Sequence, residues 1–178
     1  MSFLDISSVT PEKTNVKRGD YDIDTAKTST MTVNKAQGAS TAILRGYACE
    51  PVDTVTPNVY QVTTTASDAA VVISALPFAY IPANVEISNG EDVSATDDNV
   101  ALQAITRSDS VVVKLSGTGQ PGNKVMTAAN GEFVKYDDSD PELIKGVFKG
   151  LPGTQGGNII KQGWTDGVLG IISFNGGA

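Results

Sequence analysis

Few residues in this sequence have the chemistry that an enzyme or a metal site needs. The 178 residues include no histidine and a single cysteine, Cys49. Mechanisms that use a histidine base, histidine-ligated zinc and CxxC redox pairs are therefore excluded. With no histidine base to activate its thiol, Cys49 is interpreted as a small buried side chain.

One acidic motif has the spacing of a calcium loop. Asp20, Asp22 and Asp24 alternate as at the start of an EF-hand loop. The glycine and the glutamate that the loop requires further on are replaced by Thr25 and Met31. We therefore predict no metal ligands and interpret these acids as solvated charges.

Three further acidic clusters could supply the paired carboxylates of a glycosidase. They fall in segments predicted as turns, where aspartate stabilises the turn backbone without any catalytic role. We therefore predict no catalytic residues and no enzymatic activity. The clusters are Glu91-Asp92, Asp97-Asp98 and Asp137-Asp138-Ser139-Asp140.

A glycine-rich segment at 117–124 has the outline of a phosphate-binding loop. In that loop, lysine follows the second glycine directly and a hydroxyl residue and a helix come next. Here Asn123 separates Gly122 from Lys124, Val125 replaces the hydroxyl residue, and a hairpin strand follows. We predict a connection between strands, and no nucleotide or other cofactor.

The charge balance limits the possible partners. The chain carries 13 Lys+Arg against 20 Asp+Glu, for a net charge of −7 and a pI near 4.5. Binding to nucleic acid or to an anionic membrane needs the opposite sign. No secretory signal and no apolar run of 18 residues are visible. We expect synthesis in the cytoplasm and no nucleic-acid or membrane partner.

Composition changes along the chain and suggests three parts. Residues 1–40 are poor in large apolar side chains and are predicted to form an extended arm. Residues 41–113 are β-rich and acidic, while 114–178 hold most of the glycines and are predicted to form a β-barrel module. Alternatively, 41–178 is one domain.

Short β-branched runs separated by Gly, Pro and Asn turns predict the fold. We expect a mainly β protein, a small barrel or sandwich with an extended N-terminal arm and at most one or two short helices. Arg107-Ser108-Asp109 is predicted to form the turn of a hairpin between two strands. The segments 67–75 and 96–105 are each compatible with a helix or with a strand. The predicted strands are 41–48, 58–65, 84–87, 99–106, 110–115, 124–128, 132–136, 143–148, 158–161 and 168–174.

The C-terminal part resembles a known family. Its pattern is the strand at 111–115, then Gly122-x-x-Val125, Asn130-Gly131-x-Phe133-Val134, Ile144-x-Gly146-Val147 and Gly167-Val168-Leu169. This pattern resembles the small β-barrel of capsid decoration, or cement, proteins of tailed bacteriophages. The resemblance implies a non-enzymatic virion protein on the capsid surface. Its partners would be the major capsid protein and two further copies in a homotrimer.

The expected function is therefore to bind the outside of an icosahedral capsid and to stabilise contacts between its subunits. Phe3, Leu4 and Ile6 are the candidate anchors of the arm, and Trp164 is either a core plug or an interface anchor. The alternatives are another virion β protein, such as a head fibre or tail component, or a carbohydrate-binding or depolymerising β domain. An aromatic content of 6% speaks against sugar stacking.

Overall fold

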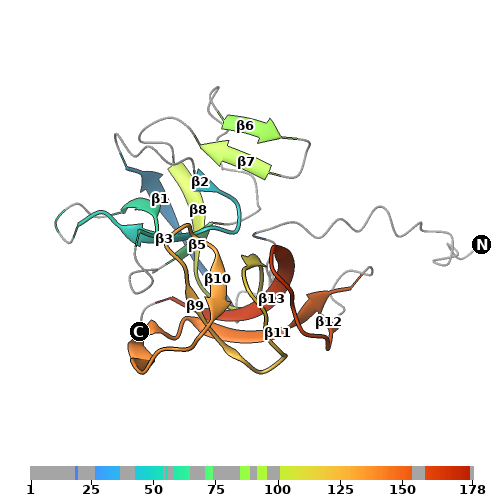
Figure 1. The fold of residues 1–178 in the computed structure, drawn as a ribbon. Helices are drawn as coiled ribbons and strands as arrows, with labels where there is room; N and C mark the ends of the chain where they lie inside the picture. Colours follow the sequence, from blue (N-terminus) through green and yellow to red (C-terminus); the bar gives the residue numbers. More distant parts are fainter. Residues whose placement is uncertain are drawn as a thin grey trace, which may run out of the picture.

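The computed structural model describes residues 19, 27–36, 43–53, 55, 58–64, 71–73, 85–88, 92–95, 101–153 and 159–176. The fold is mainly β, as predicted (Figure 1). A single 3-10 turn, η3 (Pro141–Leu143), occurs among the described residues. The strands are β1 (Thr28–Lys35), β2 (Ile43–Leu44), β3 (Ala48–Pro51), β4 (Val59–Val62), β5 (Val71–Ile73), β6 (Val85–Ser88), β7 (Asp92–Ala95), β8 (Ala101–Leu115), β9 (Lys124–Thr127), β10 (Phe133–Lys135), β11 (Gly146–Pro152), β12 (Ile159–Ile160) and β13 (Val168–Asn175).

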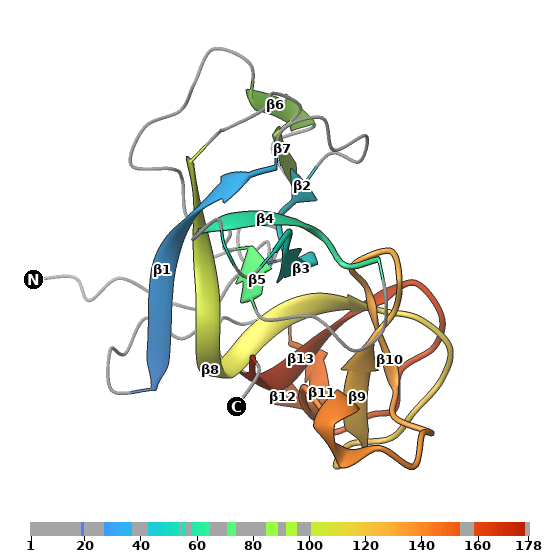
Figure 2. The same cartoon turned by 90° about the vertical axis from the view of Figure 1, so that its left-hand side faces the viewer.

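The long strand β8 organises the whole sheet. Ten strands form one hydrogen-bonded sheet that closes on itself twice, and β8 belongs to both closures. Figure 2 shows β8 running along β1 and then bending toward β9, β10, β11 and β13. We call the two closures the N-terminal ring and the C-terminal ring.

The N-terminal ring has the order β1-β4-β3-β5-β8 and returns to β1. β1 pairs antiparallel with β8 through Thr28–Asn34 and parallel with β4 at Asn34 and Lys35. β3 pairs antiparallel with both β4 and β5, and β5 pairs with β8 at Ile105 and Ala104. A closed ring leaves few strand edges free for other chains.

The C-terminal ring has the order β8-β10-β9-β11-β13 and returns to β8. β9 and β10 form the predicted antiparallel hairpin, with Gly131 in the left-handed conformation at its turn. β13 pairs antiparallel with β8 over a long register that begins at Val168 opposite Leu115. β12 extends β11 outside this ring.

The predicted hairpin link at 107–109 is wrong, because β8 continues through it. Arg107 pairs with Ser29 of β1 on one edge and with Asn175 of β13 on the other. The register shifts in both pairings, near Thr106 and near Asp109, and each shift places the extra residue in β8. Bulges of this kind bend a strand and increase its twist. The polar run therefore marks a bend within one strand.

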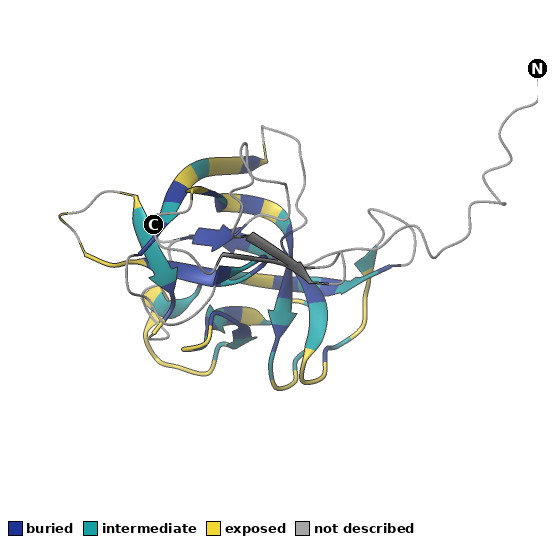
Figure 3. Cartoon of the chain, turned by 90° about the horizontal axis from the view of Figure 1, so that it is seen from above, coloured by how far each residue is buried: buried dark blue, intermediate teal, exposed yellow. Residues whose placement is uncertain are grey.

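Two hydrophobic clusters fill the rings, and β5 contributes to both. Val71 and Ile73 face the cluster of the N-terminal ring, together with Cys49 and Leu102. Val72 points to the opposite side, into the cluster that holds Trp164 and the phenylalanines of the C-terminal ring. Alternation along a strand produces this division, and Figure 3 shows buried and less buried residues alternating along the strands.

Hydrogen bonds between the rings tie them together beyond β8. The turn of the β9–β10 hairpin lies against β3 and the end of β4. The amide of Ala48 donates to the carbonyl of Gly131 at 2.8 Å, and Thr63 Oγ1 donates to the carbonyl of Ala128 at 2.9 Å. A Cβ on Gly131 would touch Val62 and Ala48, so glycine is needed both for the turn and for this close approach.

Several element boundaries differ from those predicted. Thr28–Lys35 lies within the range assigned to the arm but forms β1, so these residues belong to the sheet. Gly19 also lies against the sheet, and its amide donates to the carbonyl of Val112. The boundary predicted between 113 and 114 falls inside β8. In the part of the chain that the structure describes, no helix has the length and apolar character needed to cross a bilayer.

Two predicted strands are shorter or displaced for local reasons. The strand predicted at 41–48 is interrupted by a turn at Arg45 and Gly46, because Gly46 adopts a φ of 72°. The strand predicted at 143–148 begins only at Gly146, since Asp140 caps the 3-10 turn η3 (Pro141–Leu143) ahead of it. β2 instead joins β7 and β6 in a second, three-stranded sheet.

Candidate functional site

The glycine-rich loop at 117–124 has no free cradle for phosphate. Its backbone amides already donate within the protein: Gly117 to Asp166 Oδ1, Gly119 to the carbonyl of Trp164, and Gly122 to the carbonyl of Phe148. Gln120 donates to Asn123 Oδ1 within the loop itself. The prediction of a connection between strands agrees with this bonding, which leaves these amides committed to structural acceptors.

Trp164 lies beneath this loop and not on the surface. Its side chain is 2% exposed, and its indole Nε1 donates to the carbonyl of Ser116 at 3.1 Å. The ring packs edge-on against Phe148, with 4.6 Å between centroids. A Cβ on Gly119 would overlap the indole ring. The structure thus places Trp164 as a plug in the core of the C-terminal ring.

A partly exposed ion pair joins β8 to the β9–β10 hairpin. Lys114 Nζ lies 2.5 Å from Glu132 Oε1, and Ser116 Oγ donates to Glu132 Oε2. Burial raises the pKa of Glu132, but the hydrogen bonds from Lys114 and Ser116 and the charge of Lys114 outweigh it. The pKa of this carboxyl is therefore held below its usual value.

The acidic cluster after β10 is explained by turn chemistry. Asp138 Oδ1 accepts from the amides of Ser139 and Asp140. Asp140 Oδ1 accepts from the amide of Glu142 and caps η3. These contacts are typical of aspartate in turns. Among the described residues, no group of three or more metal-ligating side chains lies close enough together to hold an ion.

Cys49 is a core residue of the N-terminal ring. Its side chain is fully buried, and Sγ lies 3.9 Å from the carbonyl of Tyr47. Burial and the neighbouring charge of Glu50 raise the pKa of the Cys49 thiol well above its usual value. The thiol is consequently held in its unreactive form.

Two buried charged groups near β3 lack full hydrogen bonding. Glu50 Oε1 accepts from Gln61 Nε2 and Thr64 Oγ1, whereas its Oε2 has no partner in the segments that the structure describes. Among the described residues, Arg45, in the turn before β3, finds no acceptor for either Nε or Nη2. Sequence patterns gave no sign of either group, because the predicted strand at 41–48 placed Arg45 on a strand instead of in a turn.

Large apolar side chains are exposed at two described places. Val52 and Val55 lie in the loop between β3 and β4, where Val55 is 84% exposed. Asp53 Oδ1 accepts from the amide of Val55 at 2.7 Å. Val147 of β11 and Ile160 of β12 are the others.

The remaining predicted contact residues lie outside the described residues. These are the arm anchors Phe3, Leu4 and Ile6. The same holds for the Asp20-Asp22-Asp24 motif and for Asp97-Asp98. Trp164 is therefore the one candidate contact residue within the described part of the chain, and it lies in the core.

Comparisons with protein-family models and with curated proteins find no match for this chain.

Proposed function

We propose that this protein is a structural component of a virion that binds the outside of an icosahedral capsid and stabilises contacts between capsid subunits. The observation that supports this most is the C-terminal ring. Its strands come from the residues whose spacing resembles capsid decoration proteins, from Val111–Leu115 of β8 to Val168 and Leu169 of β13. The glycine-rich connection and the Asn130-Gly131 turn fall between strands, as that resemblance requires.

Binding free energy alone would perform this function. A protein that touches two or three capsid subunits at once gains avidity when the shell holds those subunits at a fixed spacing. Because it binds the assembled state and not the separated subunits, it shifts the balance toward the intact shell. We propose the major capsid protein as the partner and a homotrimer as the bound form.

The candidate contacts are the arm and one described loop. The arm anchors remain those predicted from the sequence, Phe3, Leu4 and Ile6. Trp164 is not proposed as a contact, because its ring is 2% exposed. The loop between β3 and β4 is added, since it exposes Val52 and Val55 and Asp53 accepts a hydrogen bond from the amide of Val55. Figure 1 shows this loop projecting away from the C-terminal ring.

Co-sedimentation with mature capsids tests the proposal. We expect the wild-type protein to pellet with shells and not with soluble capsid subunits, and to remain bound at moderate salt, since apolar contacts are not screened. Deletion of residues 1–8 should weaken retention without unfolding the rings. Val55→Asp should weaken it as well, while Thr118→Asp, which adds the same charge to another exposed loop, should not. No pelleting of the wild type at any salt concentration contradicts the proposal.

A carbohydrate-binding role has less support. Sugar-binding surfaces present aromatic rings to solvent, yet each of the aromatic side chains within the described residues is buried or partly buried. Phe133, Phe148, Trp164 and Phe174 all belong to the core cluster of the C-terminal ring.

A further inference from the structure

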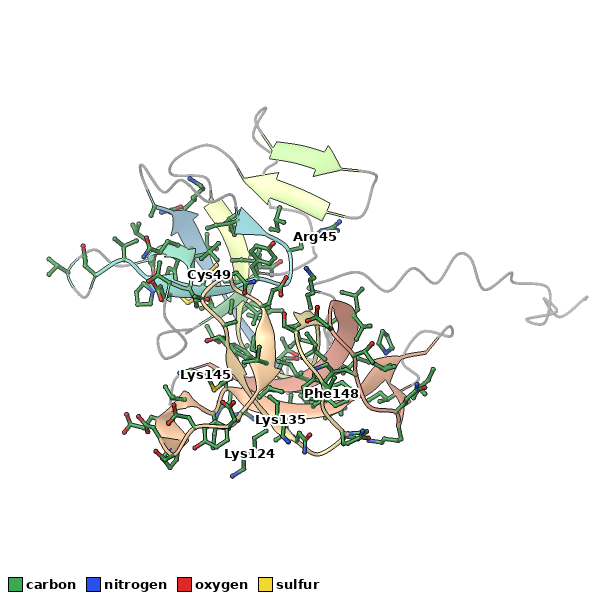
Figure 4. All side chains as sticks on the ribbon, viewed as in Figure 1. Arg45, Cys49, Lys124, Lys135, Lys145 and Phe148 are labelled. Atoms are coloured by element: carbon green, nitrogen blue, oxygen red, sulfur yellow. The ribbon has the colours of Figure 1, made fainter. Side chains whose placement is uncertain are left out.

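Arg45 occupies a turn that is fixed on both sides. It follows β2 and precedes Gly46, whose φ of 72° closes the turn. The amide of Gly46 donates to the carbonyl of Ile73 at 2.8 Å, and the amide of Ile73 donates to the carbonyl of Tyr47 at 3.0 Å. These bonds fasten the turn to β5, and Figure 4 shows Arg45 at the end of β2. The backbone next to this arginine is therefore hydrogen-bonded to β5.

The side chain of Arg45 is buried without an acceptor. Its exposed fraction is 6%, and within the described part of the chain neither Nε nor Nη2 has a hydrogen-bond partner. Arginine cannot lose its proton in a protein, so the charge stays. Burial of these two N–H groups without an acceptor costs solvation free energy. Arg107, the other arginine in the described part of the chain, avoids this cost because it is exposed.

The positions of the two unpartnered nitrogens indicate which chemical group would fit them as an acceptor. Nε and Nη2 lie on one edge of the planar guanidinium, and their N–H bonds run parallel. That edge matches the two oxygens of a single carboxylate in a bidentate pair. Glu50, the buried carboxylate nearest in sequence, does not fill this place, since its Oε1 is taken by Gln61 and Thr64 and its Oε2 has no partner.

We infer that the Nε–Nη2 edge of Arg45 receives a carboxylate side chain of the capsid subunit. The inference rests on the proposed function. A free anion would lose its own hydration on entering so buried a site, whereas a side chain held in an interface is presented at a high effective concentration. Because the edge is shielded from water in the free protein, the incoming carboxylate must displace the groups that now cover it.

The inference predicts opposite effects on stability and on binding. In Arg45→Met, an apolar side chain of similar length replaces an unpaired buried charge. The free protein should therefore melt at the same temperature as wild type or higher. Retention on capsids should fall by about tenfold or more, because the partner carboxylate then has no donor. Arg45→Lys should also weaken retention, since an ammonium cannot form the bidentate pair. Arg107→Met is the matched control and should leave both quantities unchanged.

Thermal melting and co-sedimentation of these variants give separable outcomes. Melting several degrees lower for Arg45→Met would mean that the acceptor belongs to this chain, and it overturns the inference. A rise in the wild-type melting temperature in sodium acetate over sodium chloride at equal ionic strength, absent in Arg45→Met, would assign the site to a free carboxylate and also overturns it. Equal pelleting of wild type and Arg45→Met overturns the inference while the proposed function stands. A wild type that never pellets overturns both.

Discussion

Glu132 accepts hydrogen bonds from Lys114 and Ser116 at once, and this pairing fixes the β9–β10 hairpin to β8. The pKa of Glu132 is lower in the folded chain than in the unfolded one. The ionised carboxylate therefore stabilises the native state above the usual glutamate pKa of about 4.3, and this contribution is lost as the pH falls through the folded pKa.

Glu132→Gln should consequently lower the free energy of unfolding near pH 7 by about 1–2 kcal/mol, a value kept small because Lys114 is partly exposed. Urea denaturation between pH 7 and pH 3 should show the gap between wild type and variant closing as the pH falls. Glu142→Gln, at an exposed position, is the control. If the difference in unfolding free energy stays constant over this range, Glu132 does not contribute to the pH dependence of stability.

Gly119→Ala should destabilise the C-terminal ring, because the added methyl group overlaps the indole of Trp164. Overpacking of this kind costs about 1–3 kcal/mol. Denaturation followed by the fluorescence of Trp164, the single tryptophan, measures both the loss and any change around the ring. Thr118→Ala, at the exposed neighbouring position, should be close to neutral. Equal stability of the two variants would show that the loop moves aside without cost.

Ser108→Ala should weaken the bend in β8. The hydroxyl is buried, is 2.9 Å from Thr28 Oγ1, donates to the carbonyl of Ser110 and accepts from the amide of Ser110. Its removal deletes these hydrogen bonds and should cost about 1–2 kcal/mol of unfolding free energy. Ser29→Ala, an exposed serine on β1, provides the comparison in chemical denaturation. A loss no larger than that of Ser29→Ala would contradict this role.

Cys49 and Trp164 should report the same unfolding transition. They lie in different hydrophobic clusters, but the two rings share β8 and are joined through Gly131 and Thr63. Labelling of Cys49 by a thiol reagent should be slow in the native protein, since burial raises its pKa, and should rise at the urea concentration at which Trp164 fluorescence changes. Separate midpoints would mean that one ring opens while the other persists.

Local patterns in the sequence predicted the β9–β10 hairpin and β13 of the C-terminal ring. The Asn130-Gly131 turn and its flanking β-branched residues gave the β9–β10 hairpin, and the run at 168–174 gave β13 within one residue. Turn chemistry and alternation are properties of neighbouring residues, so they can be recognised without knowing the tertiary structure.

The features that depend on distant residues could not be predicted in this way. Arg107-Ser108-Asp109 is polar and turn-like, but pairing with β1 and β13 on its two edges keeps it in a strand. The ion pair of Lys114 and Glu132 joins residues that no local pattern relates. The unpaired state of Arg45 depends on what surrounds it in space, and its turn was hidden inside a predicted strand.

The position of β8 in both rings also determines which shortened forms of the protein can survive. A gene truncated on either side of this strand would yield a polypeptide whose remaining ring keeps β8 but exposes a row of backbone groups where the missing strands had paired. Such an edge recruits strands from other chains. Shortened products are therefore expected to aggregate, and neither ring is expected to persist in a protein that lacks the other.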